Sequence, residues 1–194
     1  MAAGFCGCLK KSTDDPVVSL KTRKARVIGD WKVEKGNAHE SAISGSGSYS
    51  FYDLVYTNSS YNLNYGSGNY NGNNNVTQSG FFQYSIQLNS DGGFTSEKFM
   101  ENSEPKIRTM TGRWNFTGSV GSRKDKTQIM LTVSSLIETS KNRHVVVTEY
   151  TGDKKNYVYE IRELRNKKMV LTRELSETIE LKESHFQESI TLVQ

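Results

Sequence analysis

The segment around the first tryptophan places the strongest constraint on how this chain can fold. Residues 27–34 alternate between an apolar and a polar face, which is the period of a half-buried β-strand. Residues 110–116 repeat the Gly-x-Trp spacing, so that Gly29 precedes Trp31 and Gly112 precedes Trp114. A glycine two positions before a tryptophan shares its face and leaves room for a neighbouring backbone or ring. The two tryptophans are therefore either ordinary core residues or, in the case of Trp31, a plug at one end of a β-barrel.

Further alternating segments predict an all-β fold. The 194 residues include 35% hydrophobic residues and 2 prolines, which suits one antiparallel domain with polar outer faces. Turn signals such as the one at 89–93 separate about ten short strands, and no helix-period segment could serve as a crossover between parallel strands. We expect an antiparallel up-and-down β-barrel of about 8–10 strands over residues 16–194. In its second strand, Tyr49, Phe51 and Val55 are expected to share the inward face.

Residues 57–80 are rich in Asn, Gly, Ser and Tyr and carry no charge. Such a composition buries little apolar surface, so a long surface loop or hairpin tip is expected here. The alternative is a contact surface for a protein or glycan partner, because Tyr with Ser, Gly and Asn also makes adaptable binding loops.

The N-terminal residues resemble the end of a bacterial lipoprotein signal peptide. Small and apolar residues lead to Cys8, and a polar run begins directly after it. Cys6 departs from the usual pattern, and the basic start and apolar stretch that should come first are missing. We expect residues 1–15 to be a disordered tether that is lipidated at Cys8, the alternative being an N-terminus with two free thiols. A short helix over 17–24, with Asp15 as its N-cap, would then close one mouth of the barrel.

Several functional classes have little support in the sequence. The net charge of +4 is dispersed, so no nucleic-acid partner is indicated, and His39, His144 and His185 lack metal-ligand spacing. Motifs of nucleophilic or metal-dependent catalysis are missing, and most late acidic residues, Glu188 among them, alternate onto polar faces where solvation is expected. We expect no enzyme activity, no cofactor and no metal.

An inward arginine late in the chain provides the basis for a family resemblance. Alternation places Arg173 on one face with Met169, Leu171 and Leu175, and a buried arginine needs a partner such as an aromatic face. Together with Gly29-Asp30-Trp31 and the series of hairpins, this resembles the lipocalins, and the resemblance implies that Trp31 and Arg173 meet at the closed end of the barrel. More specifically, the chain is similar to lipocalin-like (calycin) lipoproteins of Bacteroidetes-type bacteria, whose motifs match residues 29–32, 88–94, 112–114 and 159–171. The segment at 57–80 and the higher strand count depart from that pattern.

The resemblance implies a non-enzymatic lipoprotein of the cell envelope, anchored to the outer membrane, that binds a small apolar or amphipathic ligand in the barrel. A barrel filled with side chains is the alternative, in which residues 57–80 would bind a protein or glycan at the surface. The candidate ligand-binding residues are the large inward ones, namely Phe51, Phe82, Tyr84, Trp114, Phe116, Tyr157 and Tyr159.

Overall fold

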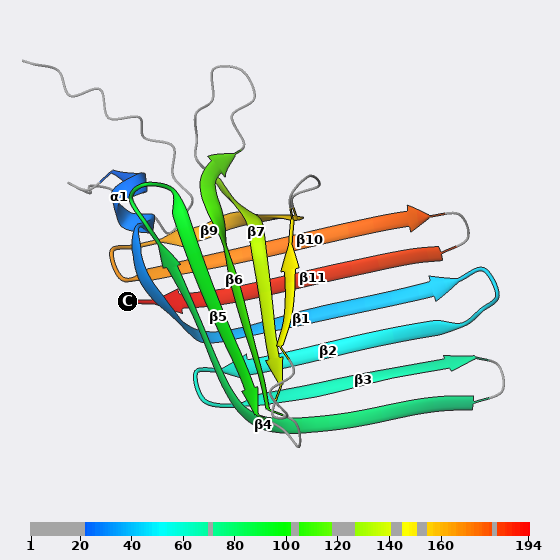
Figure 1. Cartoon of the computed structure of the whole chain (residues 1–194). Helices are drawn as coiled ribbons and strands as arrows, with labels where there is room; N and C mark the ends of the chain where they lie inside the picture. Colours follow the sequence, from blue (N-terminus) through cyan, green and yellow to red (C-terminus); the bar gives the residue numbers. More distant parts are fainter. Residues whose placement is uncertain are drawn as a thin grey trace, which may run out of the picture.

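A computed structural model of the chain describes residues 22–69, 72–101, 105–117, 127–140, 145–150, 155–179 and 182–194. These residues form one short helix and eleven strands (Figure 1). In chain order they are α1 (Arg23–Val27), β1 (Gly29–Ser44), β2 (Tyr49–Thr57), β3 (Tyr61–Asn69), β4 (Gly72–Leu88), β5 (Gly93–Glu101), β6 (Lys106–Thr117), β7 (Gln128–Ser140), β8 (Val145–Glu149), β9 (Lys155–Leu164), β10 (Lys168–Ile179) and β11 (Lys182–Val193).

The strands form one antiparallel sheet that closes on itself. Its order is β6-β5-β4-β3-β2-β1-β11-β10-β9-β7-β8, and a further pairing between β6 and β7 closes a ring of ten strands. Strand β8 lies outside this ring and pairs with the second half of β7, whereas β9 pairs with the first half. The predicted all-β, up-and-down barrel with a short N-terminal helix is therefore confirmed.

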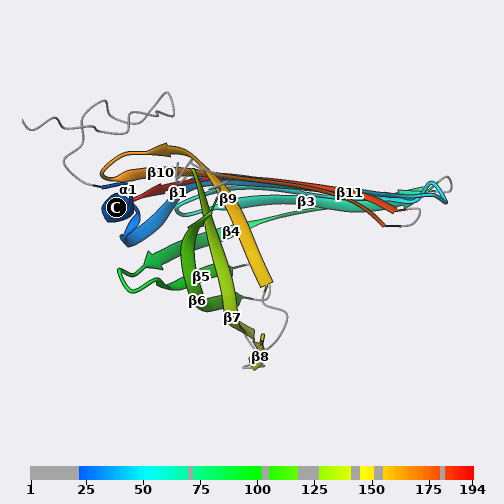
Figure 2. The same ribbon diagram turned by 90° about the horizontal axis from the view of Figure 1, so that it is seen from above.

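A second pairing divides this ring into a barrel and a flat extension. The first four residues of β1 pair directly with the end of β4, Trp31 opposite Ile86, so β2 and β3 are not needed for closure at that end. The outer parts of β1, β4, β10 and β11 continue past the barrel beside β2 and β3. Figure 2 shows this extension edge-on, as one thin layer projecting from the curled strands β5, β6, β7 and β9.

The expectation of a loop at 57–80 is wrong, because most of this segment forms β3 and the first half of β4. The backbone groups of β3 are paired with β2 on one side and with β4 on the other. Alternation also buries Tyr61 and Leu63 on one face. Hydrogen bonding to neighbouring strands therefore orders a segment whose apolar content alone would not.

Helix α1 lies at the closed end of the barrel. The described helix begins at Arg23 and is capped by Thr22, whose hydroxyl accepts a 3.1 Å hydrogen bond from the Ala25 amide. The helix expected at 17–24 and its cap lie mostly outside the described residues. Trp31 is fully buried and donates its indole N–H to the Val27 carbonyl at 2.7 Å, which ties the barrel wall to the helix.

The second Gly-x-Trp segment shows why its glycine is required. A Cβ atom on Gly112 would collide with the backbone carbonyl oxygen of Thr132 on β7 and would lie 2.8 Å from the Phe94 ring. Trp114 is buried two residues further on, and its indole donates to the Asn89 carbonyl at 2.9 Å. Gly112 therefore permits the close approach of β6 and β7 that the sequence pattern predicted.

Candidate functional site

The barrel interior changes from apolar to polar at one level along the strands. Inward residues near α1 are fully buried, as in Ile190 and Leu192 of β11 and Met169 and Leu171 of β10. The next inward residues away from α1 are polar, Glu188 on β11 and Arg173 on β10, and both are half-buried. We call the buried apolar end the floor. The polar layer is the set of inward side chains above it: Tyr84, Lys98, Tyr157, Tyr159, Arg173 and Glu188.

Glu188 lies at the centre of the polar layer. The Tyr159 hydroxyl donates a 3.0 Å hydrogen bond to Glu188 Oε2, and Arg173 is the residue directly opposite Glu188 on the neighbouring strand. Burial raises the pKa of the Glu188 carboxyl, although the Tyr159 hydrogen bond and the charges of Lys98 and Arg173 oppose this increase. The site therefore holds a carboxylate whose proton affinity is set mainly by desolvation.

Arg173 stacks on aromatic rings of the polar layer. Its guanidinium carbon lies 4.8 Å from the centroid of Tyr157 and 5.0 Å from that of Phe186. The prediction that Arg173 faces inward is correct, but the predicted pairing with Trp31 is wrong. Arg173 pairs with Glu188 on β11, and Glu188 pairs with Ala38 on β1. Ala38 lies seven positions along β1 from Trp31, and a β-bulge adds one extra residue between them. Without the bulged residue six steps remain, and at about 3.3 Å per residue they span about 20 Å. The arginine therefore lies in the polar layer and the tryptophan in the floor.

The tyrosines and Lys98 share the same interior space as Glu188. Burial, and then the nearby Glu188 carboxylate, raise the pKa of Tyr56, Tyr84 and Tyr159. Burial also lowers the pKa of the Lys98 ammonium, whose Nζ atom lies 5.4 Å above the centroid of the Phe82 ring. The layer therefore combines hydroxyl groups with charges that are only partly hydrated.

The polar layer is partly exposed to solvent. Tyr84, Lys98 and Glu188 point inward yet stay half-buried, so they border accessible space. A pocket of about 400 Å³, within the size range of small-molecule sites, lies where β9 leaves β10 beyond Thr172 and is lined by both Arg173 and Glu188. Most of its other residues, Glu160, Arg162 and Gln187 among them, lie on the outer face, so the pocket is a hollow of the outer surface at the positions of Arg173 and Glu188.

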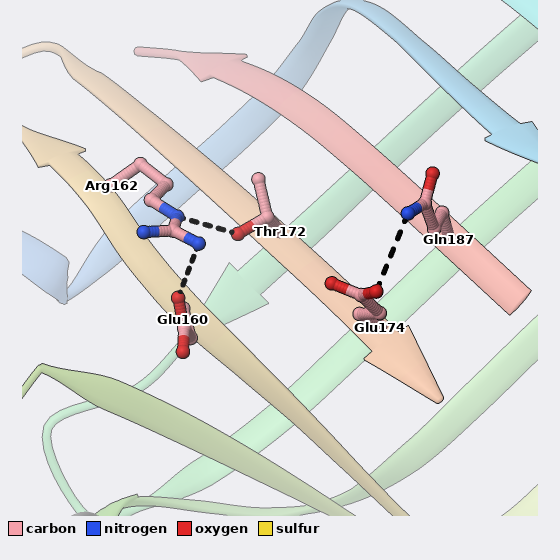
Figure 3. A network of polar contacts seen from close by, with 5 residues as sticks. All are labelled: Glu160, Arg162, Thr172, Glu174 and Gln187. Atoms are coloured by element: carbon pink, nitrogen blue, oxygen red, sulfur yellow. Dashed lines mark hydrogen bonds and ion pairs between the residues drawn. The ribbon is translucent and has the colours of Figure 1, made fainter. Parts of the chain in front are cut away.

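Polar contacts on the outer surface line this hollow. Arg162 on β9 donates to the Thr172 hydroxyl at 3.1 Å and forms a 2.7 Å ion pair with Glu160 (Figure 3). On the other side, Gln187 of β11 donates to Glu174 of β10 at 3.4 Å. The Arg162–Thr172 contact links β9 to β10 at the point where the strands diverge, the ion pair with Glu160 lies within β9, and the Gln187–Glu174 contact links β10 to β11.

A second pocket, of about 680 Å³, lies where the barrel opens onto the extension. Its residues include Tyr52, Leu63, Tyr65 and Gln78 from β2, β3 and β4, and Lys106 from β6. The Gln78 amide donates to the Tyr65 hydroxyl at 3.2 Å. The inner face of the extension therefore provides an aromatic and amide surface next to the barrel mouth.

The structure distributes the predicted ligand-binding residues over different environments. Tyr84, Tyr157 and Tyr159 belong to the polar layer, while Phe82 and Trp114 are buried in the core. Phe116 packs edge-on against Trp114, with 5.6 Å between ring centroids. Cys8 lies outside the described residues.

The prediction for Phe51 is wrong. On β2 it is Leu54 and Tyr56 that are buried, at 2% and 3% exposed, whereas Val55 is 57% exposed. Phe51 alternates with Val55 and lies opposite Gly66, on the outer face of the extension. The prediction read the strand one residue out of phase, and such a shift exchanges the two faces.

Glu188 is the site residue that sequence reasoning missed. It alternates with Phe186, Ile190 and Leu192, and this pattern places it inward. The signal was therefore present, but a single glutamate in a late strand was assigned to a solvated face.

Comparisons of the chain with protein-family models, with curated proteins and with solved structures give no match. The described residues contain no group of three or more His, Cys, Asp or Glu side chains placed to hold a metal ion. No helix in the described part of the chain is long and apolar enough to cross a membrane.

Proposed function

We propose that this protein is a non-enzymatic binding protein for a small amphipathic molecule, whose polar group lies in the polar layer of the barrel. The observation that carries the proposal is the position of Glu188, Arg173 and Lys98, which face the barrel interior above a filled floor and stay partly exposed to solvent. Burying charges is costly, and a protein that needs only a stable core has no use for them there. A pocket with a few convergent polar groups is the usual form of a small-molecule site.

The filled floor determines how such a ligand would lie. Residues such as Trp31, Leu164 and Met169 are fully buried, so the floor has no room for an alkyl chain. Apolar surface is instead available outside the layer, where Leu175 of β10 and Val76 of β4 are 40% and 41% exposed on the inner face of the extension. We expect the polar head to enter first and the apolar part to lie along the extension.

The envelope location remains part of this proposal. Lipidation at Cys8 would anchor the protein to the outer membrane and place the barrel close to a source of amphipathic molecules. Mass spectrometry of the protein purified from its own host tests this point. An added mass of acyl chains on the N-terminal peptide supports lipidation, and unmodified Cys8 contradicts it.

Binding of a neutral fluorescent probe, N-phenyl-1-naphthylamine, tests the binding site. Wild-type protein should enhance its fluorescence in a saturable manner, and Tyr84→Trp should weaken binding because the larger ring fills the polar layer. Tyr49→Trp on the outer face of β2 is the matched control and should bind like wild type. Equal binding by both variants would place the ligand elsewhere and refute the proposal.

Binding of a protein or glycan on the extension is a second candidate, supported by the pocket at the barrel mouth. Tyr65, Asn74 and Gln78 provide aromatic, amide and hydroxyl groups there. Deleting residues 58–79 would remove β3 and part of β4, so single substitutions are the better test. Asn74→Ala should reduce partner capture by the intact protein, and unchanged capture by Asn74→Ala and Tyr65→Ala would exclude this candidate.

A further inference from the structure

Two cations lie directly opposite each other inside the barrel. Lys98 of β5 and Arg108 of β6 are register partners, and alternation with buried Ser96 and with Met110 places both on the inner face. The Cβ atoms of directly opposite residues lie about 5 Å apart, and like charges at such positions are destabilising. Lys106, the next inward residue of β6, adds a third cation and lines the pocket at the barrel mouth.

Carboxylates of the described residues balance these cations only in part. Arg108 forms a 3.4 Å ion pair with Glu138, and Glu188 lies opposite Arg173 and accepts the Tyr159 hydrogen bond. Among the described residues, no carboxylate oxygen lies within ion-pair distance of the Lys98 ammonium, which instead lies over the Phe82 ring. The cations of this region are Lys98, Lys106, Arg108, Lys155 and Arg173. They outnumber the nearby carboxylates of Glu40, Glu138 and Glu188, which leaves positive charge in excess.

A neutral hydrogen-bond donor is also unused in this region. Tyr61 is 1% exposed, and its hydroxyl has no hydrogen-bond partner among the described residues. The pKa of the Tyr52 phenol is raised mainly by burial and by the charges of Glu188 and Glu40. Tyr61 lies close enough to Tyr52 to add to this increase. Buried polar groups without a partner in the protein are candidates for contact with a ligand.

We infer that the amphipathic ligand carries a single negative charge, such as a carboxylate, and that Lys98 binds this head group in the polar layer beside Arg108. The inference rests on the proposed function and adds the chemical class of the ligand. An inserted anion would offset part of the excess positive charge and relieve the repulsion between Lys98 and Arg108. Cationic and uncharged amphiphiles of the same length provide no such compensation.

A matched series of twelve-carbon amphiphiles tests this inference on the full-length protein. Dodecanoate and dodecyltrimethylammonium are titrated below their micelle concentrations, and dodecanol below its solubility limit, against bound N-phenyl-1-naphthylamine. Dodecanoate should bind about ten to a hundred times more tightly than dodecanol, as expected for one charge-assisted contact. Dodecyltrimethylammonium should be the weakest of the three.

Variants of Lys98 then assign the head group to its residue. Lys98→Met should weaken dodecanoate binding about ten- to a hundredfold and leave dodecanol binding nearly unchanged, while Lys98→Arg should keep the preference for the anion. Lys182→Met, at an exposed position on β11, is the control and should behave like wild type. If Lys98→Met alters folding, the wild-type series still decides the charge of the head group, and Lys98→Gln replaces Lys98→Met in the test of the residue.

The outcomes separate this inference from the proposed function. If none of the three amphiphiles displaces the probe from wild-type protein, the proposed function fails. If dodecanol or the cationic amphiphile binds as tightly as dodecanoate, the proposed function stands and the anionic head group is refuted. A preference for dodecanoate that survives in Lys98→Met overturns the assignment to Lys98.

Discussion

Removing the Tyr159 hydroxyl tests the environment of Glu188 most sharply. Tyr159 is 6% exposed, and its hydroxyl donates a 3.0 Å hydrogen bond to Glu188 Oε2. A hydrogen bond to a charged group contributes about 1.5–3 kcal/mol, and one between neutral groups about 0.5–1.5 kcal/mol. Tyr159→Phe keeps the ring in place. We therefore expect it to cost about 1.5–3 kcal/mol of unfolding free energy where Glu188 is ionised, and about 1 kcal/mol where it is protonated.

The pH dependence follows from the pKa of Glu188, which burial raises in the folded state. A raised folded-state pKa means that the folded protein binds the proton more tightly than the unfolded chain. The unfolding free energy therefore falls as the pH rises from the unfolded-state pKa, about 4.3 for Glu, through the folded-state pKa. The Tyr159 hydrogen bond lowers the pKa of Glu188, so its loss should raise that pKa further and steepen the fall.

Urea unfolding of wild type, Tyr159→Phe, Glu188→Gln and the double variant, at pH 4 and pH 8, measures this coupling. We expect Tyr159→Phe to cost about 1 kcal/mol more beside the ionised Glu188 than beside the neutral amide of the Glu188→Gln background. A ¹³C NMR titration of the Glu188 carboxyl should show the higher pKa in Tyr159→Phe. Equal costs in both backgrounds, with an unchanged titration, would refute the reasoning. Glu183→Gln, at an exposed position on the same strand, is the control.

Three further predictions concern packing and face assignment. Gly112→Ala should cost about 1–3 kcal/mol in urea unfolding because its Cβ collides with the Thr132 carbonyl, and a cost below that of the exposed Asn115→Ala would contradict the close approach. Trp31→Ala should cost about 3–5 kcal/mol through the cavity left in the floor, and a cost under about 1 kcal/mol would mean that the floor is not packed. Phe51→Ser should leave amphiphile affinity unchanged because Phe51 lies on the outer face, and a severalfold loss in the displacement assay would contradict that placement.

Alternation in the sequence was sufficient to predict the class of the fold and most inward residues. It placed Arg173 in line with Met169 and Leu171, and it placed Tyr84, Tyr157 and Tyr159 inside the barrel. These predictions succeed because a strand with one buried face has a strict period of two.

The same pattern could not show how far along the barrel each residue lies. The register between strands depends on where every hairpin turns. Alternation therefore showed correctly that Arg173 and Trp31 both face inward, but it could not show that they lie at different levels of the barrel. The strands at 57–80 were missed because their order comes from hydrogen bonding to neighbouring strands rather than from burial. The error at Phe51 arose because β2 carries aromatic residues on both faces, so its composition did not determine the phase.

An isotope-filtered NOE experiment on the dodecanoate complex tests the central claim most directly, since it shows where a bound amphiphile lies. Head-in binding predicts contacts from the carbons next to the carboxylate to the rings of Tyr84 and Tyr157, and from the far end of the chain to Leu175 on the inner face of the extension. Contacts of the chain end with Trp31 and Met169 in the floor, or contacts confined to Phe51 on the outer face, would contradict it.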